Sequence, residues 1–243
     1  MDIETISSLA ATHGLSLRGG FAVSNDDRVP TPESGAVAQS LVLFGNTGSA
    51  IWPTFSSCPE IKDGLDNPLD RWSKRIGDDL AAQLGGVAYY PFAGPPHQPF
   101  ISWAQKAEAL RPSKLGMLLH PEFGLWHAYR FALALPYDLF DKQTNNLQQR
   151  HACDTCKDQP CYSACPVEAF VNGHYDVNRC VRYLDANPQG TCNHSGCMAR
   201  MSCVEAEQHR YLQPHAEFHI NQFLKARLKV LSDIPDSGPS NVS

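Results

Sequence analysis

The spacing of apolar residues along the chain predicts alternating helices and strands in its N-terminal part. Residues 68–84 show the clearest helical period, with Pro68 suited to the first turn and Asp70 at the positive end of the helix dipole. Asn67 stands where a residue can cap this helix through its side chain. Weaker helical patterns cover residues 2–13, 100–110 and 216–231.

Short apolar runs bounded by glycine, proline or polar residues predict strands. They cover residues 15–24, 40–45, 87–92, 114–120 and 126–136. The last run alternates, which places Tyr129, Phe131, Leu133 and Leu135 on one side of the strand. The mixture of helices and strands indicates an α/β fold of the α+β kind.

Composition narrows the range of partners. The chain has 243 residues, 42% of them hydrophobic, and a formal net charge of −5. Because proteins that bind nucleic acid carry basic patches, we expect no nucleic-acid partner. No apolar run approaches the length of a transmembrane helix, and "MDIETISSLA" at the N-terminus lacks a charged-then-apolar leader. We therefore expect a cytoplasmic protein with no membrane partner.

The nine cysteines are distributed unevenly. Only Cys58 lies in the first 150 residues, and the other eight fall between Cys153 and Cys203. Disulfides rarely persist in the reducing cytosol, where clustered cysteines more often bind metal. We expect Cys58 to be a small buried residue and the segment that starts at Cys153 to bind metal.

The eight clustered cysteines form two groups, and the first group ends in Cys165-Pro166. A [4Fe–4S] cluster needs four thiolates at one site, and the cysteine before such a proline binds the other cluster in two-cluster ferredoxins. The spacing therefore predicts two [4Fe–4S] clusters with crossed ligation. Cluster 1 takes Cys153, Cys156, Cys161 and Cys203, and cluster 2 takes Cys165, Cys180, Cys192 and Cys197.

Two alternatives stay open for these cysteines. Zinc favours four-cysteine sites built from paired motifs, as in a zinc-stabilised binding module, but it gives no reason for the Cys-x3-Cys-Pro ending. A single cluster is also open, because the spacings in the second group are looser than the usual two residues. Between the two groups, Asn172-Gly173 predicts a hairpin turn that folds one group back on the other.

These patterns divide the chain into three parts. Residues 1–145 form the predicted α/β domain, and residues 150–212 form the cysteine-rich module. Residues 213–243 contain a terminal amphipathic helix and a tail whose composition predicts disorder. The polar, amide-rich residues 137–150 are the predicted linker.

The cysteine-rich module resembles a bacterial-type ferredoxin, and in particular the module of the epoxyqueuosine reductases. The stretch "NRCVRYL" (Asn178–Leu184) is similar to an Arg-Cys-(aliphatic)-x-Tyr-Leu element of that family. Upstream, "LLHPEFGLW" (Leu118–Trp126) is similar to the family's leucine-rich stretch. Continued as "HAYRFALALP", the same segment is similar to an element of the animal cobalamin-processing (decyanase) protein. The resemblance spans about residues 40–205.

The resemblance implies a nitroreductase-like, or flavin-reductase-like, α/β domain followed by a ferredoxin-like iron–sulfur module. It implies a corrinoid (cobalamin), or failing that a flavin (FMN or FAD), on the α/β domain, reduced by electrons from the clusters. The candidate cofactor-binding residues in the matching segment are His120, Gly124, Trp126 and His127. Packing in the core or at its rim is the alternative for the histidines and tryptophan. A flavodoxin or ferredoxin reductase is the expected electron donor.

Two departures leave epoxyqueuosine reductase activity itself unassigned. The family's glycine-rich element is replaced by "ALRPSKLG" (Ala109–Gly116). The stretch that corresponds to its catalytic aspartate reads "PPHQPFISWA" (Pro95–Ala104) and contains no carboxylate. The sequence therefore leaves two functions open: a corrinoid-dependent reductase, and a ferredoxin-like electron-transfer protein without a catalytic site of its own.

Overall fold

The computed structural model describes residues 2–31, 37–108, 110–140, 151–171 and 173–232. The chain divides into two compact units. The first unit is Met1–Ser113, Met117–Cys156 and Val204–Arg210, and the second is Lys114–Gly116, Lys157–Cys203 and Tyr211–Ser243. Most of the predicted linker, the boundaries near residues 145 and 150, and the predicted disordered tail lie outside the described residues. The division into three parts therefore stays a prediction.

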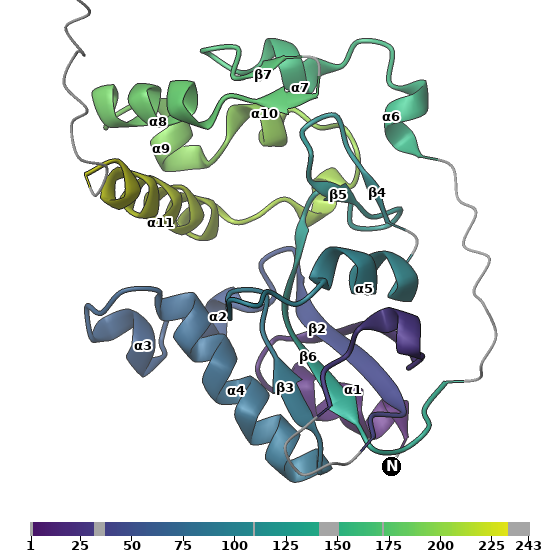
Figure 1. The fold of residues 1–243 in the computed structure, drawn as a ribbon. Helices are drawn as coiled ribbons and strands as arrows, with labels where there is room; N and C mark the ends of the chain where they lie inside the picture. The colour runs from purple at the N-terminus through teal and green to yellow at the C-terminus, as the bar shows by residue number, and fades with distance from the viewer. Residues whose placement is uncertain (1, 32–36, 109, 141–150, 172, 233–243) are drawn as a thin grey trace, which may run out of the picture. The chain divides into compact units, whose positions relative to one another are not determined.

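A four-stranded antiparallel sheet organises the first unit (Figure 1). Its order is β1 (Ser16–Ala22), β2 (Ser40–Thr47), β6 (His127–Leu135) and β3 (Val87–Tyr89). β2 and β6 pair from end to end, with Ser40 opposite Leu135 and Thr47 opposite His127. This pairing brings the start of β6 beside the end of β2, where the polar network described below is found.

Helices cover both faces of this sheet. On one face, Leu41 and Leu43 of β2 pack with Phe100 and Trp103 of α5 (Phe100–Ala107). On the other face, the rings of Phe44 and Phe131 stack with centroids 5.0 Å apart, and α4 (Pro68–Leu84) packs against β6. The unit also contains these elements: α1 (Ile3–Ala11), η1 (Asn25–Asp27), α2 (Trp52–Phe55), α3 (Pro59–Lys62), β4 (Arg111–Pro112), β5 (Leu118–Leu119), α6 (Ala152–Thr155) and η2 (Glu207–His209).

The longest predicted helix of the first unit, α4, has the expected bounds, but its cap differs. Asn67 adopts a left-handed conformation at φ 54° and makes no side-chain capping hydrogen bond, so the predicted cap is wrong. Within α4, a Cβ placed on Gly77 would lie 2.7 Å from the Tyr90 hydroxyl oxygen. Glycine at this position therefore lets α4 approach the ring of Tyr90 closely.

Two predicted strands differ in part from their sequence patterns. Burial in β6 does not alternate, because every residue of Arg130–Leu135 is buried. α4 packs against β6, and Ala132 and Ala134 belong to the cluster that contains Phe100 and Trp103 of α5, so both faces of the strand are covered. The strand predicted over residues 114–120 is reduced to Leu118–Leu119, which pairs with Arg111–Pro112.

The second unit consists of short elements and one long helix. They are α7 (Pro160–Ser163), β7 (Phe170–Val171), β8 (His174–Tyr175), α8 (Val177–Ala186), α9 (Thr191–Ser195), α10 (Met198–Met201) and α11 (Gln213–Ser232). The antiparallel pair β7–β8 confirms the predicted hairpin, although Asn172 lies outside the described residues. α11 packs on α8 and α9, and α10 packs on α7 and α9. α11 begins three residues before the predicted start.

The two units differ sharply in their hydrophobic cores. The largest fully buried side chains among the described residues, which include Trp72, Trp103 and Trp126, all belong to the first unit. The buried apolar side chains of the second unit are fewer and mostly small: Leu115, Ala169, Val181, Leu184, Cys192, Ala199, Tyr211 and Ala216. The second unit therefore has the smaller hydrophobic core among the described residues.

No described helix is both long enough and apolar enough to span a lipid bilayer.

Candidate metal centre and buried polar network

The four predicted ligands of cluster 2 all lie in the second unit. Cys165 follows α7, Cys180 lies within α8, Cys192 lies within α9, and Cys197 is the N-cap residue of α10. The four cysteines thus lie within or next to four different helices. In such an arrangement, folding of the chain brings together ligands that do not belong to one continuous sequence motif.

The thiols of these four cysteines lie close enough to influence one another. Burial raises the pKa of Cys180, and the charges of Cys165 and Cys192 raise it further. Burial also raises the pKa of Cys197 to about 11, with further contributions from Cys180 and Cys192. Burial and the charge of Cys165 raise the pKa of Cys192. The predicted ligand set of cluster 2 is therefore a spatial group as well as a sequence pattern.

One backbone donor lies at a sulfur of this group, because the N–H of Ala169 donates to the sulfur of Cys165 over 3.3 Å. The backbones of Met198 and Arg200 offset part of the rise in the pKa of Cys192 and Cys197, respectively. Such donors stabilise negative charge on sulfur, as iron–sulfur sites require. The chemistry of this donor set suits an iron–sulfur cluster.

The predicted ligands of cluster 1 are divided between the two units. Cys153 lies in α6 and Cys156 is its C-cap residue, both in the first unit. Cys161 lies in α7 and Cys203 follows α10, both in the second unit. Because α10 packs on α7, the structure brings together the two helices next to Cys161 and Cys203. The complete ligand set of cluster 1 stays a prediction.

Among the residues that the structure describes, no three histidine, cysteine, aspartate or glutamate side chains form a group that could hold a single metal ion. A zinc ion binds its sulfurs at about 2.3 Å and so draws them close together. In a cubane cluster each thiolate binds a separate iron atom, so the sulfurs stand further apart. The two kinds of site thus require different spacings of their thiols.

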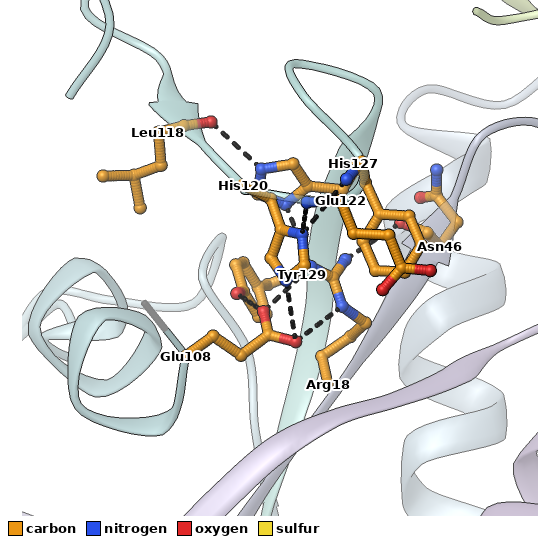
Figure 2. A network of polar contacts seen from close by, with 9 residues as sticks. Arg18, Asn46, Glu108, Leu118, His120, Glu122, His127 and Tyr129 are labelled. Carbon is orange, nitrogen blue, oxygen red and sulfur yellow. Dashed lines mark hydrogen bonds and ion pairs between the residues drawn. The ribbon is translucent and has the colours of Figure 1, made fainter. Parts of the chain in front are cut away.

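A second notable group of side chains is the buried polar network of the first unit, shown in Figure 2. Arg18 of β1 is only 1% exposed and forms two hydrogen bonds with the carboxylate of Glu108, at 3.1 and 2.8 Å. The hydroxyl of Tyr129 donates to the same carboxylate, and Nε2 of His120 lies 3.8 Å from it. Three donors of different kinds therefore converge on one carboxylate.

Hydrogen bonds in this network fix the tautomers of both predicted cofactor-binding histidines. Nδ1 of His120 accepts from the backbone N–H groups of Glu122 and Phe123, at 3.0 and 3.1 Å, so its proton is on Nε2. Nε2 of His127 lies 3.0 Å from the carbonyl oxygen of Leu118 and must donate to it. Burial lowers the pKa of His120, which favours the neutral ring.

Arg18 completes the arrangement around these histidines. Its guanidinium lies 3.3 Å from Nδ1 of His127, which therefore accepts, and it donates to the backbone carbonyl of Asn46 over 3.2 Å. It also lies 5.1 Å from the ring centroid of Phe123 and 5.0 Å from that of Tyr129. Such cation–π contacts add to the ion pair. Arg18 thus anchors the turn that joins β5 to β6.

The other two predicted cofactor-binding residues support the same turn. Trp126 is 1% exposed and belongs to the core. Gly124 has φ 56°, and a Cβ placed on it would lie 2.7 Å from the carbonyl oxygen of Glu205. Glycine is needed here both for its positive φ and for this close approach. The four predicted residues therefore share one turn, and their role in binding a cofactor stays a prediction.

The sequence did not reveal that the buried polar network includes Arg18, Glu108 and Tyr129. A charged residue inside the apolar run "LSLRGGFA" was the signal available for Arg18, because a buried strand seldom carries an unpaired charge. Glu108 follows α5 and offers no comparable signal.

Comparisons with known proteins bear on the fold. No protein-family model and no curated protein sequence matches this chain. The chain is similar to the crystal structure of a selenomethionine-labelled epoxyqueuosine reductase, with 17% identity, a TM-score of 0.51, and coverage of 88% of this chain and 68% of that one. This likeness shows a shared fold. The mixture of helices and small antiparallel sheets also confirms the α+β class predicted from the sequence.

Two further solved structures show a weaker likeness. An epoxyqueuosine reductase with an epoxyqueuosine-modified tRNA-Tyr stem loop shares 16% identity at a TM-score of 0.47. An epoxyqueuosine reductase from Bacillus subtilis, with its catalytic loop swung out of the active site, shares 16% identity at a TM-score of 0.49. Each covers 88% of this chain and 67% of the other.

The stem-loop complex contradicts one expectation from the sequence. We expected no nucleic-acid partner, yet one of these similar structures holds a tRNA stem loop. The expectation is wrong because it rested on the net charge of −5, which is a property of the whole chain. Phosphate contacts depend on local groups of basic residues, which a negative net charge does not exclude.

Proposed function

We propose that this chain is an iron–sulfur redox protein whose two [4Fe–4S] clusters pass electrons to a corrinoid, or failing that a flavin, bound on the first unit. In this proposal the second unit is a ferredoxin-like module, the first is a nitroreductase-like domain, and the protein acts as a reductase. A one-electron donor, such as a flavodoxin or ferredoxin reductase, supplies the electrons.

The observation that carries the proposal is the grouping of Cys165, Cys180, Cys192 and Cys197 in the second unit. These four cysteines come from separate short segments of the chain and interact electrostatically, and the sulfur of Cys165 accepts a hydrogen bond from the backbone N–H of Ala169. They are also the set that the Cys-Pro spacing assigned to a single cluster. The spacing of the cysteines in the sequence and their interactions in the structure thus support the same four ligands.

The small core of the second unit supports a structural role for the clusters as well. A unit with few large buried apolar side chains gains stability when its cysteines bind a metal group, because binding free energy then contributes to folding. In this unit Val181 and Leu184 are the larger buried aliphatic side chains of α8, the helix that also carries Cys180. Cluster binding would therefore hold α8 in place.

In the first unit, the polar network defines what the chain could offer a corrinoid or flavin. Both ring nitrogens of His127 and Nδ1 of His120 already have hydrogen-bond partners, so these three nitrogens cannot coordinate a metal without breaking hydrogen bonds. Tyr129 keeps its proton, because burial and the charge of Glu108 raise its pKa. The network would therefore position the turn beneath a cofactor and retain a proton at Tyr129.

A second function, electron transfer without a catalytic site, is favoured by one observation. The stretch "PPHQPFISWA" contains no carboxylate, and the nearby carboxylate of Glu108 is held by Arg18 and Tyr129. A carboxylate that accepts three hydrogen bonds is a poor proton donor. On this view the first unit is a docking scaffold.

Iron and acid-labile sulfide analysis of cysteine variants tests the shared part of both functions. We expect about eight iron atoms per chain in the wild-type protein and about four in Cys180→Ser, since cluster 2 would lose a ligand. Cys58→Ser is the matched control, because Cys58 is buried in the first unit and should not change the iron content. Zinc in place of iron would refute the proposal.

An anaerobic titration with cob(II)alamin separates the two functions. A reductase that uses a corrinoid should perturb the absorption spectrum of cob(II)alamin on binding, and Gly124→Val should weaken that effect by distorting the turn. Iron-loaded protein that leaves the spectrum unchanged would favour the electron carrier.

A further inference from the structure

A buried side chain, that of Asn193, connects α9 to the C-terminal end of α8. Asn193 lies in α9 and is 6% exposed. Its side-chain nitrogen donates to the backbone carbonyl of Leu184 over 3.0 Å and to that of Asn187 over 2.8 Å. A carboxamide NH2 group carries two hydrogens, so these two bonds use its full capacity as a donor.

The two acceptors lie where a helix needs donors from outside. Leu184 belongs to the last turn of α8, and Asn187 is the C-cap residue of this helix. Carbonyl groups at the end of a helix lack the partner that the helix itself provides further inside, so other groups must satisfy them. Leu184 is 1% exposed, so water does not readily replace the donor. Asn193 therefore supplies a cap to α8 from the neighbouring helix.

This cap lies close in the chain to two predicted ligands of cluster 2. Cys180 precedes Leu184 by four positions, which places both residues on the same face of α8. Cys192 directly precedes Asn193 and is 7% exposed. α8 and α9 each pack on α11, and Asn193 adds hydrogen bonds directly between α8 and α9. The position of one cysteine relative to the other therefore depends on this side chain.

We propose that Asn193 is a positioning residue that sets the separation of Cys180 and Cys192 as ligands of cluster 2. The inference rests on the proposed function, since it requires a cluster at these cysteines. In a cubane cluster each thiolate binds a separate iron atom. A shift of α9 against α8 would move one thiolate away from its iron while the other three ligands stay in place. The iron that loses its thiolate would then dissociate more readily.

The test replaces the amide of Asn193 with a carboxylate of the same shape. Asn193→Asp removes both donors, so the iron-loaded protein should release the iron of cluster 2 to a chelator about 10-fold faster or more, as is typical when residues that orient metal ligands are lost. Mild oxidation should also produce a three-iron cluster, detected by electron paramagnetic resonance, while cluster 1 stays intact.

Asn187→Asp is the matched control for this experiment. It makes the same chemical change at the end of α8, but the hydrogen bond that it removes, from the side chain of Asn187 to the carbonyl of Tyr183, is exposed and stays within the same segment. We expect Asn187→Asp to release iron at the rate of the wild-type protein and to form no three-iron cluster.

The outcomes separate this inference from the proposed function. If the wild-type protein binds no iron–sulfur cluster, the proposed function fails and this inference fails with it. If Asn193→Asp holds both clusters and releases iron as the wild-type protein does, only the role of Asn193 is overturned. If Asn193→Asp does not hold cluster 2, Asn193→Gln, whose amide keeps both donors, should hold it. Loss of cluster 2 from both variants would assign Asn193 a purely structural role and overturn the inference.

Discussion

Replacing Arg18 with methionine tests the account of the buried polar network. Methionine keeps much of the length of the apolar stem but removes the charge, so Glu108 loses the two hydrogen bonds at 3.1 and 2.8 Å. The side chain of Glu108 is 14% exposed, so water reaches it only in part. Removing one partner of a buried ion pair costs about 3–5 kcal/mol. Because Tyr129 still donates to Glu108, we expect Arg18→Met to lower the free energy of unfolding by about 3 kcal/mol.

The assay is urea unfolding followed by tryptophan fluorescence, since all four tryptophans lie in the first unit. The double variant Arg18→Met/Glu108→Gln should recover part of the loss, because it leaves no uncompensated charge. Lys74→Met is the control: its ion pair with Asp78 joins side chains that are 58% and 50% exposed, and such pairs contribute less than about 1 kcal/mol. If Arg18→Met costs no more than Lys74→Met, the reasoning about the network is refuted.

Three further predictions follow from particular contacts. Arg75 holds the pKa of Glu60 at about 2, so the ionised Glu60 stabilises the fold fully at pH values above its unfolded pKa of about 4.5. The difference in free energy of unfolding between wild type and Glu60→Gln should therefore shrink as the pH falls from 4.5 towards 2. A difference that does not change with pH would contradict this prediction. Gly77→Ala should lower the free energy of unfolding by about 1–3 kcal/mol, because the added Cβ would press on Tyr90. The control is Asp79→Ala on the exposed side of α4, which should change the free energy of unfolding by less than about 0.5 kcal/mol. If the proposed clusters stabilise the second unit, removing iron with a chelator should reduce far-ultraviolet helicity while leaving tryptophan fluorescence unchanged; simultaneous loss of both signals would argue against this.

Local sequence patterns predicted the long elements well. The 3.6-residue period of Leu69, Trp72, Ile76 and Leu80 reflects the buried face of α4, so its bounds could be read directly. The four- and five-residue helices α7, α9 and α10 were missed, since so short a helix shows no period. The burial of both faces of β6 depends on which helices cover the sheet, and alternation within one strand does not reveal that.

For the candidate sites too, local patterns could be predicted from the sequence, whereas contacts between distant segments could not. Cysteine spacing predicts the ligand group of cluster 2, because neighbouring ligands leave a local pattern in the sequence. His120 and His127 were singled out, but one hydrogen bond of His127 depends on Arg18, which is 109 positions away. Contacts between distant segments carry this information, and a single sequence does not display them.

Native mass spectrometry of the anaerobically purified protein tests the central claim most directly. The mass of the folded chain should exceed that of the polypeptide by the mass of two Fe4S4 groups, and Cys197→Ser should lose one of them. A wild-type mass that corresponds to zinc, to a single cluster or to the bare polypeptide would contradict the account of two crossed clusters.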